Sequence, residues 1–164
     1  MILGKHKTLL EDTRARGDAD TDAMALCFEV LSLAAAIDRD CAARLQPHRL
    51  SEGKFVLLTL LCDRPQGLPP HELADRVGVT RATITGLIDG LERDGLLRRV
   101  PDKTDRRSLS VRLTPQGLAL ADELGRTHTA WIATLTGDLT GEERGMLRSL
   151  LHKIWARTAA GHVS

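Results

Sequence analysis

Two short stretches of the sequence contain side chains that can form hydrogen bonds with anions and with the polar edges of nucleic-acid bases. The first stretch combines threonines, one arginine and two small residues: Thr80, Arg81, Ala82, Thr83, Thr85 and Gly86. The second ends in Asp105, Arg106 and Arg107. Guanidinium groups bind phosphates and the acceptor edge of guanine, and threonines bond to phosphates or touch thymine methyl groups. These residue types suit contact with duplex nucleic acid if the fold presents both stretches on one surface.

The first stretch lies in the second half of a predicted helix-turn-helix. A first-turn proline opens a short helix that Gly78 closes, and Thr80 caps the helix that follows. Ala74 and Ile84 supply the small and the apolar residue that a steep helix crossing needs. The inward positions of the second helix are Ile84, Leu87, Ile88 and Leu91. The residues of the first stretch therefore face outward or, for Thr83, lie at the flank, where a recognition helix reaches base edges.

The second stretch lies at the tip of a predicted β-hairpin. After Gly95 the apolar pattern changes from a helical to an alternating period, and strands 96–100 and 109–113 flank a polar run. Between positions 98 and 112 there are six lysines or arginines against two aspartates, an excess of four positive charges that the net charge of +1 hides. We expect Asp105 to support the hairpin by holding one arginine, Arg106 or Arg107, while the other enters a narrow minor groove.

The other predicted elements are helices. A polar arm with one helical turn around Leu9 and Leu10 occupies residues 1–20, and a long helix follows over 21–45. Helices are also predicted over 52–62, over 115–135 and after Thr140, which forms a capping box with Glu143. The fold class is mainly α with a small β-hairpin: a winged helix-turn-helix (48–114) flanked by long terminal helices (21–47 and 115–160). Their apolar faces have no third layer within the chain, so we expect a homodimer in which a second copy covers them.

Composition argues against several classes of protein. Two phenylalanines, two tryptophans and no tyrosine are too few aromatic platforms for binding single-stranded nucleic acid. No apolar run is long enough to span a bilayer, and the charged N-terminus does not resemble a signal peptide, which predicts a cytoplasmic protein without membrane contact.

Catalytic and metal sites are also not expected. The three cysteines are widely spaced, and the histidines His48, His128 and His152 form no close ligand pair, so neither a zinc site nor a disulfide framework is predicted. A glycine-rich phosphate loop and a nucleophile–base motif are both missing from the sequence. We therefore expect neither an enzyme nor a cofactor.

The combined motifs resemble the MarR family of bacterial regulators over about residues 21–157. The resemblance rests on 50–55, on 73–99, on Pro101 to Arg107 and on 111–117. It implies a triangular homodimer, joined through the terminal helices, that binds a palindromic operator in double-stranded DNA, usually as a repressor released by a small molecule. It also implies that residues 80–86 read the major groove and that Arg106 or Arg107 enters the minor groove. Many members carry arginine where this chain has Gly86.

Two alternatives and the effector stay open at this point. Cys27, within Leu26–Glu29, resembles the peroxide-sensing branch of the family, but this chain has no tyrosine and no positive charge close to the thiol, which favours a partly buried structural cysteine. A winged helix can also pack on protein instead of DNA. An aromatic or anionic effector of unknown identity would bind between the dimer helices and the winged helix. The polar and aromatic residues near that crevice in chain order, none assigned to a site, are Arg39, Arg44, His48, Arg49 and Trp131.

Overall fold

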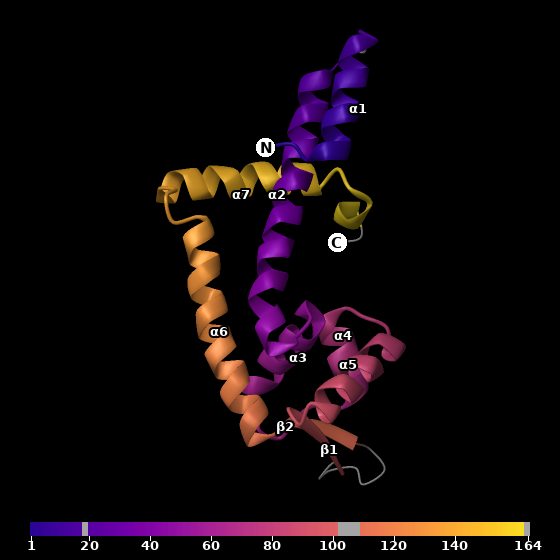
Figure 1. Ribbon diagram of the computed structural model, residues 1–164, viewed down its shortest axis with the longest axis vertical. Coiled ribbons are helices and arrows are strands. Elements are labelled where there is room, and N and C mark those ends of the chain that lie inside the picture. Colours follow the sequence, from indigo (N-terminus) through magenta and orange to yellow (C-terminus); the bar gives the residue numbers. More distant parts are fainter. Residues whose placement is uncertain (18–19, 102–108, 163–164) are drawn as a thin grey trace.

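The computed structural model describes residues 1–17, 20–101 and 109–162 of the chain, and Figure 1 shows their arrangement. A two-stranded hairpin and a group of short helices form the lower lobe, while long helices extend away from it. The helices and strands are α1 (Gly4–Ala15), α2 (Thr21–Leu45), α3 (Glu52–Cys62), α4 (Pro70–Val77), α5 (Arg81–Arg93), β1 (Leu97–Pro101), β2 (Leu109–Leu113), α6 (Pro115–Leu135) and α7 (Gly141–Trp155). Apart from α1, these bounds agree with the sequence predictions to within one or two residues.

The core of the lower lobe lies where α3, α4, α5, the hairpin and the start of α6 meet. Leu57, Leu58, Ile88 and Leu91 are fully buried there. Full burial of one leucine or isoleucine side chain contributes about 1.5–3 kcal/mol, so this cluster is the main source of the lobe's stability. The hydrogen-bonding side chains predicted at the helix starts are in place, including Thr80 at α5 and the capping box of Thr140 at α7.

Besides pairing with β1, strand β2 forms a backbone bridge with a residue that precedes α4, a contact that was not predicted from the sequence. β1 pairs antiparallel with β2 in the register Leu97 to Leu113, and Leu68 forms an isolated bridge with Val111 on the other edge of β2. The preceding Gly67 has a φ of +73°, and a Cβ there would lie 2.2 Å from the Val111 carbonyl oxygen. Only glycine fits this approach without strain, so the turn before α4 is fixed against the hairpin.

The N-terminal segment differs from the expected arm with one helical turn. It forms the 12-residue helix α1, which packs along the first half of α2. The His6 ring stacks on Phe28 with centroids 4.6 Å apart, and the backbone N–H of Leu3 donates to Ser32 Oγ at 3.1 Å. The face that α1 turns to α2 includes His6, Leu10 and Thr13, a helical spacing in which only one residue is apolar. Because most of the residues on this face are polar, the helix leaves no apolar periodicity in the sequence.

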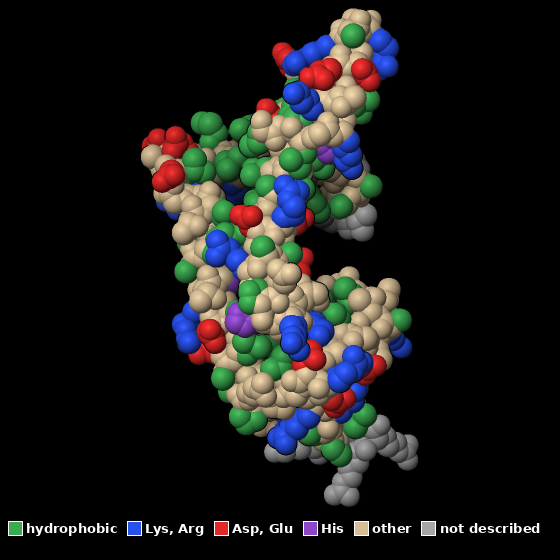
Figure 2. All heavy atoms as spheres, in the orientation of Figure 1, with side chains coloured by type: hydrophobic (Ala, Val, Ile, Leu, Met, Phe, Trp, Pro, Cys, Tyr) green, Lys and Arg blue, Asp and Glu red, His purple; other side chains and the backbone are tan. Residues whose placement is uncertain are grey.

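The long helices leave much apolar surface uncovered. α6 rises from the hairpin, and α7 turns away from its upper end and lies across α2 (Figure 1). Hydrophobic side chains gather over α7 and the upper part of α2 (Figure 2). In α7 no residue is buried, although its apolar stripe consists of Met146, Leu147, Leu150, Leu151, Ile154 and Trp155. Among the described residues, no helix is both long and apolar enough to cross a membrane.

Two glycines of α6 provide a paired test of the junction between hairpin and helix. A Cβ at Gly117 would lie 1.8 Å from the Leu96 carbonyl oxygen, whereas a Cβ at Gly125 would meet nothing within 4 Å. Gly117→Ala is expected to lower the free energy of unfolding by about 3 kcal/mol, because backbone must move to relieve the clash. Gly125→Ala should raise it by up to about 1 kcal/mol through helix propensity. Urea unfolding measures both, and equal effects of the two substitutions would contradict the close approach.

Candidate nucleic-acid interface

Helix α5 presents one polar face to solvent because its opposite face is held in the core. Ile84, Ile88 and Leu91 are at most 1% exposed, and Leu87 is half-buried. Six residues at the start of the helix are exposed: Thr80, Arg81, Ala82, Thr83, Thr85 and Gly86. Their outward orientation, predicted from the sequence, is confirmed. The interior contacts fix the direction of this face, so its small and polar residues form a defined surface.

The threonines at the start of α5 differ in what their hydroxyl groups can do. The Thr80 side chain accepts a hydrogen bond from the Thr83 backbone N–H at 3.2 Å, and the two hydroxyl oxygens lie 2.9 Å apart. The Thr85 hydroxyl donates to the Arg81 carbonyl oxygen at 2.8 Å. These bonds occupy the Thr85 donor within its own helix and hold Thr80 and Thr83 in one arrangement. The capping role of Thr80 was predicted from the sequence and is confirmed, whereas the bond that occupies the Thr85 donor was not predicted.

An ion-pair cluster that the sequence analysis missed fixes the hairpin to α5. The Arg99 side chain on β1 forms ion pairs with both Asp89 and Glu92 of α5. The Arg99 backbone N–H also donates to Glu92 Oε1 at 3.0 Å. The hydrogen bond to Asp89, aided by the charges of both carboxylates, raises the pKa of Arg99 above its usual value. Two acidic residues three positions apart on a helix, followed by an arginine on the next strand, are a signal that could have revealed this contact.

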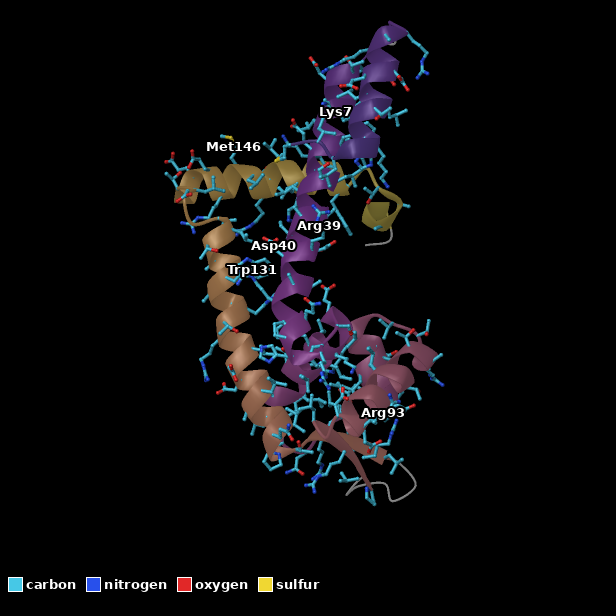
Figure 3. The ribbon with its side chains drawn as sticks, viewed as in Figure 1. Lys7, Arg39, Asp40, Arg93, Trp131 and Met146 are labelled. Carbon is cyan, nitrogen blue, oxygen red and sulfur yellow. The ribbon has the colours of Figure 1, made fainter. Side chains whose placement is uncertain are left out.

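The tip of the hairpin lies outside the described residues. The predicted residues Asp105, Arg106 and Arg107 belong to this tip, so their arrangement is not described. The strands below the tip lie beside α5 at the lower end of the molecule, far from α1 and α7 (Figure 1). Arg93 on α5 lies at this same end (Figure 3). The base of the hairpin and the exposed face of α5 therefore belong to one lobe.

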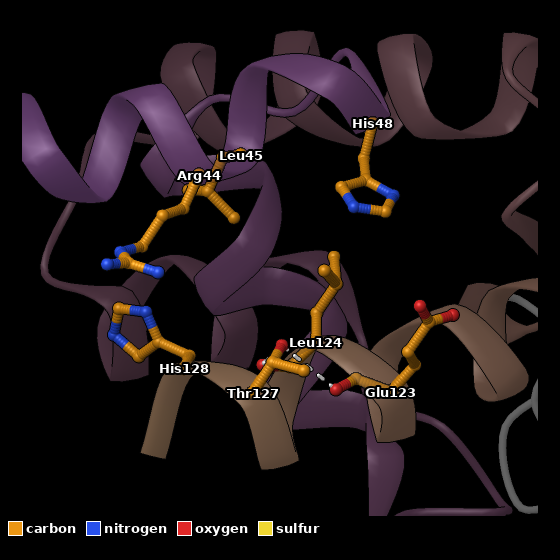
Figure 4. Close-up of a pocket in the computed structure, with 7 residues that line it drawn as sticks. All are labelled: Arg44, Leu45, His48, Glu123, Leu124, Thr127 and His128. Carbon is orange, nitrogen blue, oxygen red and sulfur yellow. Dashed lines mark hydrogen bonds between the residues drawn. The ribbon is translucent and has the colours of Figure 1, made fainter. Parts of the chain in front are cut away.

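A second feature is a cavity of about 210 Å³ between the end of α2 and α6 (Figure 4). Its lining mixes polar and apolar surface and consists of Arg44, Leu45, His48, Glu123, Leu124, Thr127 and His128. Of the residues expected near the crevice, Arg44 and His48 line this cavity, while Arg39, Arg49 and Trp131 do not. Glu123, Thr127 and His128 come from α6 and were not anticipated from the sequence.

A row of side chains in cation–π and tilted aromatic contact joins this cavity to the core. The Arg44 guanidinium lies over the Trp131 ring, 4.8 Å from its centroid. The His128 ring lies between two aromatic rings, 5.1 Å from Trp131 and 4.8 Å from Phe55 of α3. Cation–π and aromatic contacts at these distances are attractive. The row therefore links α2, α6 and α3 through one continuous contact.

The cysteines do not form a shared site. Cys27 is exposed on α2, which corrects the expectation of a partly buried cysteine, because the described residues cover little of its side chain. Cys41 and Cys62 are half-buried, and burial raises the pKa of each thiol, which disfavours reactive thiolates. Across residues 1–17, 20–101 and 109–162, no group of three or more His, Cys, Asp or Glu side chains is placed to hold a metal ion.

Comparison with known proteins places the chain in a family. A family model described as "MarR family" matches residues 50–109. The HTH-type transcriptional repressor YetL of Bacillus subtilis is 33% identical over 156 residues, which cover 94% of this chain and 93% of that protein. The HTH-type transcriptional regulator PecS of Dickeya dadantii is 29% identical over 141 residues, 85% of each chain.

Solved structures share the fold. A MarR protein from Peptoclostridium difficile superposes with a TM-score of 0.65 at 26% identity, covering 79% of this chain and 84% of its own. Streptococcus pneumoniae FabT, solved in complex with DNA, gives a TM-score of 0.70 at 20% identity over 81% of this chain and 94% of its own, and shows the winged-helix fold alone. With the extended match to YetL, the motifs and the fold agree: this chain belongs to the MarR family of winged-helix transcription regulators.

Proposed function

We propose that this protein is a homodimeric repressor that binds a palindromic DNA operator and is released from it by a small anionic effector. The observation that carries the proposal is the exposed face of α5, directed outward by Ile84 and Ile88 and joined to the hairpin through Arg99. A helix held in this way can enter a major groove as a rigid unit while the hairpin reaches the adjacent minor groove.

The DNA contacts follow from the chemistry of these two elements. In the major groove the contacts are made by Thr80, Arg81, Ala82, Thr83, Thr85 and Gly86, among which the small residues allow close approach to the bases. Arg106 and Arg107 contact the minor groove, with Asp105 supporting them. The DNA complexes of FabT and of Staphylococcus aureus MepR, with TM-scores of 0.70 and 0.67, support a DNA-binding role for this fold.

The dimer follows from the uncovered apolar surface. Residues 21–47 and 115–160 form the dimerisation region, and residues 48–114 form the DNA-binding domain. Trp155 and Met146 of α7 are 58% and 68% exposed, and Leu26 of α2 is 55% exposed. Large apolar patches of this kind on a soluble chain mark interaction surfaces. A second copy that covers them would also set the spacing of the two α5 helices near one turn of DNA, about 34 Å.

The effector would bind in the cavity between α2 and α6. Arg44 and His128 give one side of it hydrogen-bond donors suited to a carboxylate, and His48 adds a further donor. The acidic Glu123 lies on the opposite side from Arg44 and His128 (Figure 4), and Leu45 and Leu124 provide apolar contact. A cavity of about 150 Å³ accepts benzene, so 210 Å³ has room for a single-ring acid. Two proteins to which this chain is similar are associated, by name or by bound ligand, with aromatic acids or their derivatives: a homoprotocatechuate degradative operon repressor, 29% identical, and Rhodococcus jostii CouR, solved with the thioester p-coumaroyl-CoA.

Effector binding would act by population shift. A ligand that favours one separation of the two DNA-binding lobes lowers operator affinity if that separation differs from the operator's half-site spacing. Because Arg44 lies over the Trp131 ring and the His128 ring contacts Phe55 at a tilt, a ligand that bonds to Arg44 and His128 changes contacts that reach α3. α3 packs on α5, so the signal has a direct route to the DNA-binding face.

The wing arginines provide the first test. An operator is selected from a random duplex library with the purified dimer, and binding is measured by fluorescence anisotropy against a scrambled duplex. The wild type should prefer the operator, and Arg106→Ala or Arg107→Ala should weaken operator binding by about tenfold, because a minor-groove contact is lost. Absence of any operator preference in the wild type contradicts the proposal as a whole. If both variants bind as the wild type does, the wing makes no contact.

The ion pairs of Arg99 provide a test of how the hairpin is positioned. Arg99→Ala should lower operator affinity by at least threefold and the free energy of unfolding by about 1–2 kcal/mol, because Asp89 and Glu92 lose their partner. Arg126→Ala is the matched control, since Arg126 forms an exposed ion pair with Asp122 on α6 and should leave both quantities nearly unchanged. Anisotropy and urea unfolding measure the two effects. Unchanged operator binding by Arg99→Ala would show that these ion pairs do not position the wing.

The effector cavity is tested with a panel of hydroxybenzoates and hydroxycinnamates. At least one should raise the melting temperature and release the operator. Arg44→Gln should keep operator binding and lose this response, because the carboxylate loses its guanidinium partner. Arg39→Gln is the control, since Arg39 lies on the same helix outside the cavity. If both variants respond as the wild type does, the effector binds elsewhere.

A further inference from the structure

A shallow concavity of about 370 Å³ lies between the start of α4 and the start of α5. It is lined by Pro70 and His71 of α4 and by Arg81, Ile84 and Thr85 of α5. None of these residues is acidic. The concavity therefore has two side chains that can donate hydrogen bonds to an anion, above a lining of proline, isoleucine and threonine carbon atoms.

Arg81 occupies a different angular position around α5 from the residues that would face the major groove most directly. Successive residues of an α-helix are rotated by about 100°, so Ala82 and Gly86 lie opposite the buried stripe of Ile84 and Ile88. Arg81 lies about 60° from Ile84 by the same rotation, at the edge of the buried stripe. Its place in the concavity with His71 shows that this edge is the one beside α4. Arg81 thus lies at the side of the reading face.

Two neighbouring arginines of this lobe are held in ion pairs, whereas Arg81 forms none with the residues that the structure describes. Arg76 on α4 forms an ion pair with Glu72 at 2.7 Å, and Arg99 is held by two carboxylates. Within the ranges that the structure describes, no carboxylate forms an ion pair with Arg81 or His71. The Thr85 hydroxyl donates to its own helix, so the side-chain donors toward this concavity are those of Arg81 and His71.

We propose that this concavity holds one sugar–phosphate unit of the DNA backbone, with Arg81 and His71 bonding to the same phosphate. The apolar lining suits a deoxyribose, and the two nitrogen donors suit the phosphate oxygens. Arg81 is then a positioning contact that sets the register of α5, and base reading falls to the more central Ala82 and Gly86. The inference rests on the proposed DNA-binding function and deepens it by adding His71 and assigning the role of Arg81.

The test compares affinity for the selected operator and for a scrambled duplex of equal length, across a range of KCl concentrations. Arg81→Ala should weaken binding to both duplexes by a similar factor, about tenfold or more, and lower the salt slope by about two per dimer, one phosphate contact in each half-site. His71→Ala should weaken both by a smaller common factor. The double variant should lose less than the product of the two factors, because the residues share one phosphate. Arg126→Ala serves as the control for loss of a distant positive charge.

A scan of the operator with single methylphosphonates locates the phosphate. One position in each half-site should weaken the wild type most, weaken Arg81→Ala and His71→Ala less, and leave the double variant unaffected. An effect of Arg81→Ala that is confined to one base pair, with an unchanged salt slope, would make Arg81 a base reader and overturn the inference. Independent effects of the two substitutions would overturn the shared phosphate. If the wild type binds both duplexes equally, sequence-specific function is refuted, but the phosphate contact can still be measured. If it binds neither duplex, the proposed function and the phosphate contact are both overturned.

Discussion

The burial of one side of α5 is the constraint on which the rest of this structure depends. Ile84, Ile88 and Leu91 pack against α3 and the hairpin, and this packing leaves one direction for the helix's polar face. Hydrophobic burial supplies the stability but is not directional. Orientation comes from the packing of α4, with its buried Ala74, on α5 and from the ion pairs of Arg99, which join the hairpin to the same helix. The base of the hairpin and α5, the two elements of the proposed DNA contact, are therefore joined directly to each other.

The second constraint is the uneven covering of the long helices. The lower half of α2 and the start of α6 contribute Leu45, Ala121 and Leu124 to the core, whereas α7 has no buried residue. A single chain thus has a well-packed lobe attached to helices that require a partner. The row of contacting side chains from Arg44 to Phe55 lies where these two parts join. A ligand in the adjacent cavity would act at the joint between the part that dimerises and the part that binds DNA.

Several features of the fold and the site could be predicted from the sequence, and others could not, for identifiable reasons. The ends of α3, α6 and α7 could be predicted from capping residues and helix-breaking residues, because these residues act on the backbone close to them in the sequence. α1 was underestimated because its contact face includes a histidine and a threonine, whose burial depends on Phe28 and Ser32 of α2. The exposure of Cys27 and the ion pairs of Arg99 were missed because they depend on the packing of neighbouring elements.

Sequence alone determined the order of elements, the outward face of α5 and the family, since these depend on spacing along one chain. Tertiary structure alone decided which residues from distant segments meet. His71 and Arg81 are ten positions apart and share a concavity, and Arg44 reaches Trp131 and His128 across more than eighty residues. The physical reason is that periodicity reports which side of an element is apolar, whereas contacts between polar side chains depend on how the elements cross.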